Sequence, residues 1–199
     1  MMLIEETTVP DVALPIEAFK AHLRLGTGFG QESVQDEVLG GFLRAAMAAI
    51  ESRTGKILMT RTFSWSLTFW RDRDCQVLPV APITAVTRLA LVTRDGTTTE
   101  IAADQYWLEQ DSQRPRLRAV GARLPNIPQA GSAVVEFEAG FGADWSALPA
   151  DLSQAVFLLA AHYYEYRDET SLQEGSMPFG VSSLIERYKA LRIGGGARR

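Results

Sequence analysis

Residues 62–69 read TFSWSLTF, and polar and apolar side chains alternate strictly along them. Successive side chains of a β-strand point to opposite faces, so Phe63, Trp65, Leu67 and Phe69 are expected on one face and the hydroxyl side chains on the other. Strict alternation of this kind predicts a strand with one buried and one exposed face. We take it as the first strand of a β-rich central part of the chain.

Further short strands are predicted after this one. Residues 83–93 are rich in β-forming side chains, Asp95 followed by Gly96 is typical of a tight hairpin turn, and residues 97–101 are the expected return strand. Three more candidates lie at residues 106–109, 116–120 and 133–139. The pattern predicts a meander of roughly six short antiparallel strands.

The residues before this central part have helical periodicity. Pro15 suits the first turn of a helix, where the missing N–H is not needed. A second helix is predicted from an N-cap at Ser33 to a left-handed capping residue at Gly55. Its apolar stripe is expected to comprise Val34, Val38, Phe42, Ala46, Ala49 and Ile50.

Helical periodicity returns after the strands. Pro149 is expected to open a helix, and a final helix is predicted at about residues 181–191, before the glycines at 194–196. The first of these helices presents one apolar face, made by Leu152, Val156, Leu159, Ala160 and Tyr163.

The order of these segments predicts an α+β protein. Two helices alone make a poor core, so we expect the N- and C-terminal helices to pack together as a small helical bundle, with an antiparallel β-rich domain inserted between them. The expected parts are residues 1–56 and 142–193 as the two halves of the bundle, 57–141 as the insertion, and 194–199 as a flexible basic tail.

Composition excludes several classes of protein. The chain has 199 residues, with 24 acidic and 20 basic side chains and a net charge of -4, whereas a generic nucleic-acid binder has a basic excess. The single cysteine, Cys75, excludes an intramolecular disulfide framework, and two histidines, His22 and His162, exclude a multi-histidine metal site. No apolar run approaches ~18 residues, so no membrane span is expected, and residues 1–10 do not resemble a secretory signal.

Catalytic chemistry has one weak candidate. His162 is followed by Glu165 and Asp168 at helical spacing, which leaves a hydrolase or nuclease as an alternative function. The favoured interpretation is a half-buried histidine on a packing surface, because the motif lacks a nucleophile. Residues 26–30, GTGFG, follow a helix rather than a strand, so we expect a connection rather than a phosphate-binding loop. We assign no catalytic, cofactor-binding or metal-ligating residue.

A basic stripe is the other candidate site. Arg114, Arg116 and Arg118 alternate and are expected on one face of a strand, as are Glu136 and Glu138 on a later one. The favoured interpretation is cross-strand pairing of these charges in a hairpin. The alternative is a DNA-binding module, or a lining of a DNA channel, that uses the three arginines.

The order of several longer segments resembles a known family. They are residues 18–24 (AFKAHLR), 45–62 (AAMAAIESRTGKILMTRT), 78–83 (LPVAPI), 135–169 (VEFEAGFGADWSALPADLSQAVFLLAAHYYEYRDE) and 178–181 (PFGV). Together they resemble the head–tail connector, or head-completion adaptor, proteins of tailed phages and gene transfer agents. The resemblance covers about residues 16–193, and it rests on order and spacing because each motif is degenerate.

The resemblance implies a structural protein without enzymatic activity or cofactor. Members of that family form a twelve-fold ring below the portal protein and join it to a tail-side connector or stopper protein, at the head–tail junction of particles assembled in the bacterial cytoplasm. DNA passes through the ring, so the implied partners are further copies of the chain, the portal, the tail-side protein and transient, non-specific DNA, without a membrane. It also implies a portal-binding role for Leu191, Arg192, Ile193, Arg198 and Arg199.

Overall fold

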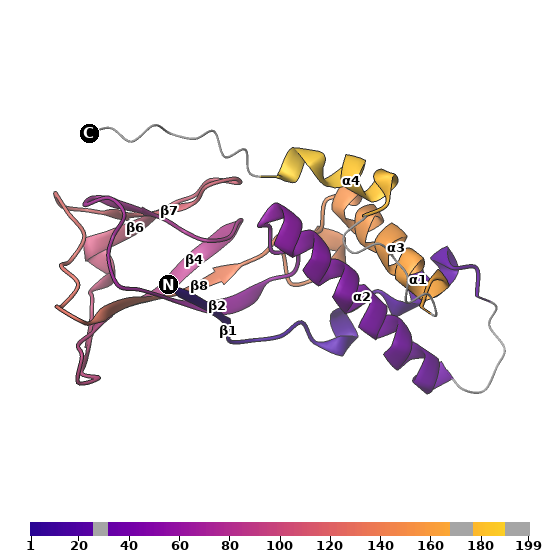
Figure 1. Cartoon of the computed structure of the whole chain (residues 1–199), viewed down its shortest axis with the longest axis horizontal. Helices are drawn as coiled ribbons and strands as arrows, with labels where there is room; N and C mark the ends of the chain where they lie inside the picture. The colour runs from indigo at the N-terminus through magenta and orange to yellow at the C-terminus, as the bar shows by residue number, and fades with distance from the viewer. Residues whose placement is uncertain (26–31, 168–176, 190–199) are drawn as a thin grey trace.

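The computed structural model describes residues 1–25, 32–167 and 177–189, and it confirms the predicted α+β class. Helices gather at one end of the molecule and strands at the other (Figure 1). The buried apolar side chains form two clusters, one among the helices and one between the sheets. The domain limits expected from the sequence stay a prediction.

The bundle contains α1 (Ile16–His22), α2 (Glu32–Thr54), α3 (Ala150–Glu165) and α4 (Phe179–Ile185). Helix α3 packs against both α2 and α4, so helices from the two ends of the chain share one core, as predicted. The apolar face predicted for α3 is correct, since Leu152, Val156 and Leu159 are buried there. Short 3-10 turns flank the bundle and sheets: η1 (Asp11–Ala13), η2 (Ala103–Gln105), η3 (Trp145–Ala147) and η4 (Glu186–Tyr188).

Helix α2 differs from its prediction at its start and on its buried face. It begins at Glu32, so Ser33 lies inside the helix rather than at its N-cap. Val38 is 48% exposed, whereas Leu39 and Leu43 are fully buried. Turning the larger leucines inward buries more apolar area than burying Val38 would. Ala46 and Ile50 of the predicted stripe are fully buried, as expected. The end of the helix agrees with expectation, because the φ of 68° at Gly55 is the left-handed conformation predicted for the capping residue.

The larger sheet has five antiparallel strands in the order β1-β2-β8-β4-β5. They are β1 (Met2–Glu5), β2 (Arg61–Leu67), β8 (Ser132–Ala139), β4 (Ile83–Val92) and β5 (Thr98–Glu100). The predicted meander is wrong, because β8 lies between β2 and β4 and pairs with both. Its alternate residues, Ala133, Val135 and Phe137, are fully buried, as suits a central strand. Strand β1 was not predicted, since its four residues show no alternation.

A second sheet of three strands lies over the inner face of the first. It consists of β3 (Cys75–Val77), β7 (Arg116–Ala119) and β6 (Tyr106–Glu109), in that order. Leu117 of β7 and Tyr106 of β6 join Trp65 and Phe137 of the large sheet in one buried cluster. The β-part is therefore a small sandwich whose core is separate from that of the bundle.

Bundle and sandwich are joined where the chain leaves α2 and where it leaves β8. The two segments lie side by side: Thr60 N donates to Gly142 O at 2.9 Å, and Phe141 N donates to Leu58 O at 3.0 Å. Arg61 Nη2 donates to Glu51 Oε1 at 2.6 Å, which ties the first residue of β2 to α2. Within the described residues the chain passes between the two parts three times, between β1 and α1, between α2 and β2, and between β8 and α3.

Candidate assembly interface

The arginines of β7 form ion pairs within the small sheet. Arg118 Nε donates to Glu109 on the neighbouring strand β6, and Arg116 Nη1 lies 3.5 Å from the same carboxylate. Arg118 also lies 3.7 Å from Asp74. Bonding to Glu109 raises the pKa of the Arg118 guanidinium, so this arginine stays charged while the carboxylate neutralises it locally. This pair of residues does not present a bare basic stripe.

The partners predicted for these arginines were wrong. Glu136 and Glu138 belong to the other sheet, and Glu136 accepts a hydrogen bond from Arg88 at 2.7 Å. Arg114 precedes β7, where its backbone N–H donates to Asp111 Oδ1 at 2.8 Å. Cross-strand pairing of charges was the correct principle, but the strand order that decides the partners could not be derived from periodicity.

His162 lies among aromatic rings. It is half-buried on α3, and its ring centroid lies 4.7 Å from that of Tyr166 and 6.4 Å from that of Tyr163. Glu165 is exposed, and in the part of the chain that the structure describes no hydrogen bond joins it to His162. Asp168, the other proposed partner, lies outside the described residues. Among the described residues the surroundings of the imidazole are those of a packing surface, and none of these residues places a catalytic group beside it.

In the part of the chain that the structure describes, Cys75 and the acidic side chains form no reactive centre either. Burial raises the pKa of the Cys75 thiol, which keeps it protonated and unreactive. Across residues 1–25, 32–167 and 177–189, no three histidine, cysteine, aspartate or glutamate side chains gather where they could hold a metal ion. Within the same ranges no helix has the length and apolarity needed to cross a membrane.

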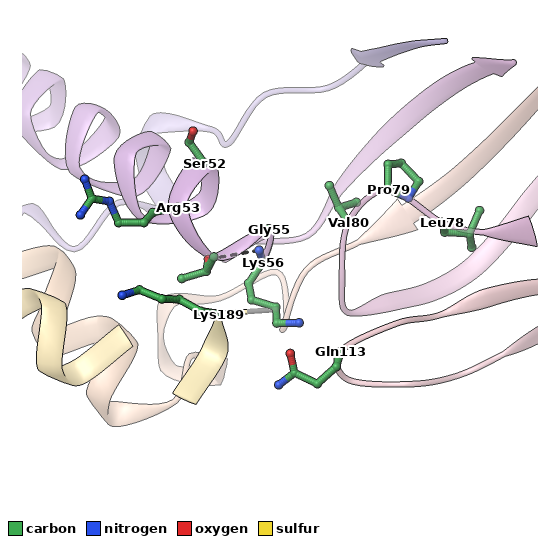
Figure 2. A pocket seen from close by; sticks show the side chains of 10 residues that line it. Ser52, Arg53, Gly55, Lys56, Leu78, Pro79, Val80, Gln113 and Lys189 are labelled. Carbon is green, nitrogen blue, oxygen red and sulfur yellow. Dashed lines mark hydrogen bonds between the residues drawn. The ribbon is translucent and has the colours of Figure 1, made fainter. Parts of the chain in front are cut away.

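A cationic hollow, which was not predicted from the sequence, lies at the junction of bundle and sandwich (Figure 2). Its volume is about 500 Å³, and Arg53, Lys56, Gln113 and Lys189 are among its lining residues. Lys56 is 1% exposed, and its Nζ donates to the Ser112 carbonyl at 2.7 Å. Burial lowers the pKa of this ammonium group. A lysine is rarely buried, so nothing in the local sequence indicated this placement.

The buried ammonium predicts a distinct pH dependence of stability. Because its pKa in the folded protein lies below the ordinary 10.5, the unfolded chain binds more protons in the interval between these two values. The free energy of unfolding should therefore rise with pH in that interval. In Lys56→Met this rise is lost. Denaturant titrations at a series of pH values from neutral towards 10.5 should therefore show the free energy of unfolding of the wild type increasing relative to that of the variant. A difference in the free energy of unfolding between the two proteins that stays constant with pH would contradict this expectation. Lys20 is present in both proteins, so its contribution cancels in the difference.

Several large apolar side chains are exposed on the bundle and on the sheet edge. Val12 is 95% exposed, Phe179 is 87% exposed, and Val38 lies beside Gly41 on the outer face of α2. At the sheet edge, Met2 and Ile4 of β1 are 57% and 42% exposed. Apolar side chains exposed to this extent are available to contact another protein. The exposure of Val38 was not predicted, since this residue had been expected in the core.

The five residues with an expected portal-binding role, Leu191, Arg192, Ile193, Arg198 and Arg199, lie outside the described residues. The glycine-rich segment at residues 26–30 does so as well. Their roles stay predictions.

Comparison with known proteins gives a clear result at the level of structure. No protein-family model matches the chain, and no curated protein matches it. A solved chain from the neck of an empty gene transfer agent (GTA) particle, computed with six-fold symmetry, is 52% identical to it. The match covers 100% of both chains with a TM-score of 0.90. The chain belongs to the family of GTA neck proteins.

Two further structures agree with this assignment of the neck protein. A chain in the virion of a native GTA particle is 52% identical, with a TM-score of 0.86 over 98% of this chain and 99% of the other. A chain in the neck of a native GTA particle, computed with twelve-fold symmetry, is 49% identical, with a TM-score of 0.85 and full coverage of both. The GTA part of the resemblance stated from the sequence is thereby confirmed.

Proposed function

We propose that this neck protein is a structural head–tail adaptor. In this proposal it forms a ring, twelve-fold in symmetry, between the portal protein and a tail-side connector or stopper protein at the head–tail junction, and DNA passes through the ring. The observation that carries the proposal is the full-length similarity to a chain of a GTA neck computed with twelve-fold symmetry. That similarity extends over the whole of both chains, so it concerns the bundle and the sandwich alike.

The charge distribution of the chain supports passage of DNA rather than its retention. Proteins that hold DNA neutralise phosphates with unpaired basic side chains, and their affinity falls steeply with salt. Here the net charge is -4, and Arg116 and Arg118 are engaged by Glu109. A surface of this kind lets DNA slide past, whereas a basic stripe would bind it.

The adaptor role is tested by assembly on the portal. The chain is co-expressed with the portal protein of the same particle, and the complex is measured by native mass spectrometry and negative-stain imaging. We expect a ring of twelve copies in contact with the portal, by similarity to the neck computed with twelve-fold symmetry. A chain that stays monomeric and never binds portal would contradict the proposal.

Removal of the last six residues, 194–199, is expected to leave folding intact and weaken attachment to the portal. The reason is the implied portal-binding role of the basic end of the chain. Melting temperature and the amount of portal recovered by affinity purification are the two measurements. The substitutions Arg198→Ala and Arg199→Ala, made together, separate the loss of charge from the loss of chain length. Equal portal recovery by wild-type and truncated proteins would remove this role.

A further inference from the structure

A hollow on the outer side of the bundle has an apolar floor. It lies between α2 and the chain around η1, and its volume is about 690 Å³. A Cβ added at Gly40 would meet the side chains of Leu14 and Ile16 at 3.7 Å, so these two residues form the floor there. A Cβ added at Gly41 would meet nothing within 4 Å, so the hollow is open at that residue. Val12, which is 95% exposed, stands at its rim.

The charged groups of this rim are largely neutralised within the chain. Arg44 Nη2 donates to Asp11 Oδ1 at 2.5 Å, and Lys20 Nζ lies 2.6 Å from Asp36 Oδ1. Glu37 is the remaining acid of the lining. An apolar floor inside a rim of paired charges favours an uncharged, apolar occupant.

An apolar side chain of suitable size projects from another surface of the bundle. Phe179, the first residue of α4, is 87% exposed. Its helix is anchored by Val181 and Ile185, which are fully buried in the bundle core. The ring is therefore held outward on a fixed helix, and burying it in a partner would remove a large apolar area from water.

The hollow and the phenylalanine lie on different sides of the bundle. Helix α3 packs against α2 and against α4, and it lies between them in Figure 1. Gly41 faces away from the α3 side of α2, since Leu39 and Leu43 face the core. Two different surfaces that meet head to tail form a heterologous contact, which closes into a ring when the rotation between copies permits.

We propose that Phe179 of one copy inserts into the hollow beside Gly41 of the next copy. This inference rests on the proposed ring and names the contact that closes it. A second copy is favoured as the occupant because knob and hollow occur on the same chain, and because the neck chains similar to it were computed with six- and twelve-fold symmetry. Cyclic symmetry requires each subunit to present two different faces to its neighbours.

A pair of cysteines tests this contact directly. The double variant Gly41→Cys, Phe179→Cys is assembled on the portal, oxidised and run on a denaturing gel without reductant. We expect a ladder of multimers of this chain, because each subunit can link to two neighbours. Either single variant should give no ladder, and the native Cys75 is buried. The matched control is Val120→Cys with Phe179→Cys, since Val120 is 62% exposed but lies on the sandwich.

The outcomes separate this contact from the adaptor role. A wild-type ring on the portal without a ladder from the double variant would overturn the contact and leave the adaptor role standing. A cross-link to portal or tail-side protein alone would overturn it as well. Absence of any wild-type ring on the portal would count against the adaptor role itself.

A substitution pair supplies an independent measurement of the same contact. Phe179→Ser should lower the yield of portal-bound rings by about ten-fold or more, as expected for a central apolar anchor, with an unchanged melting temperature. Phe69→Ser is the matched control, because Phe69 is also exposed, at 68%, but belongs to the sandwich. Ring yields that are equal for wild type and Phe179→Ser would contradict the inference.

Discussion

Gly140→Ala is expected to lower the free energy of unfolding by about 3 kcal/mol or more, from overpacking and backbone strain together. Gly140 has a φ of 139°, which side chains other than hydrogen rarely tolerate. A Cβ at this position would lie 2.6 Å from the backbone carbon of Met59 and closer still to the backbone of Thr60. The segment around Gly140 is held close to the segment around Met59, because Phe141 N donates a hydrogen bond to Leu58 O in the same junction.

Chemical denaturation monitored by tryptophan fluorescence measures this effect. Gly121→Ala is the matched control, because a Cβ at Gly121 would meet nothing within 4 Å and its backbone is outside the strained region. Its stability should stay within about 0.5 kcal/mol of wild type, as is usual for surface substitutions. A loss of equal size in both variants would show that the close approach at Gly140 is not the cause.

Arg61→Met is expected to destabilise the protein by about 3–5 kcal/mol, the range for removing one partner of a buried ion pair. The Arg61 and Glu51 side chains are only 10% and 12% exposed, and the guanidinium donates to both oxygens of the carboxylate at 2.6 Å. Burial already raises the pKa of Glu51, and Arg61 opposes that rise. Without the arginine, the carboxylate is left charged in a desolvated site or must take up a proton.

Two variants make this expectation specific. In Arg61→Met, Glu51→Gln the second substitution removes the stranded charge, so part of the lost stability should return. Arg88→Met breaks a comparable pair with Glu136, but there both side chains are about one-third exposed, so the loss should be clearly smaller. Equal losses for Arg61→Met and Arg88→Met would contradict the role assigned to burial.

The regular elements could be predicted from the sequence because their signals are local. Strand β6 was predicted at the residues where it occurs, and the turn at Asp95 and Gly96 joins β4 to β5 as expected. Gly55 and Pro149 marked the end of α2 and the start of α3. Capping, turn chemistry and the two-residue period each depend on a few neighbouring side chains, so one sequence suffices to read them.

The long-range arrangement could not be derived in the same way. Strand β8 lies between β2 and β4 because it pairs with both, and this pairing is a property of the assembled sheet. The partners of Arg118 and the burial of Lys56 follow from that arrangement. The exposed Phe179 likewise gave no local signal, because an apolar residue at a helix start is equally compatible with a core position.

The three passages of the chain between bundle and sandwich have a consequence for a particle that must withstand handling. Any pull that separates the two halves is shared by three covalent tethers rather than carried by one. Proteolytic cleavage of one connecting segment therefore leaves bundle and sandwich covalently joined through the other two. The subunit should stay in the particle after a cleavage that would separate the two parts of a protein with one linker.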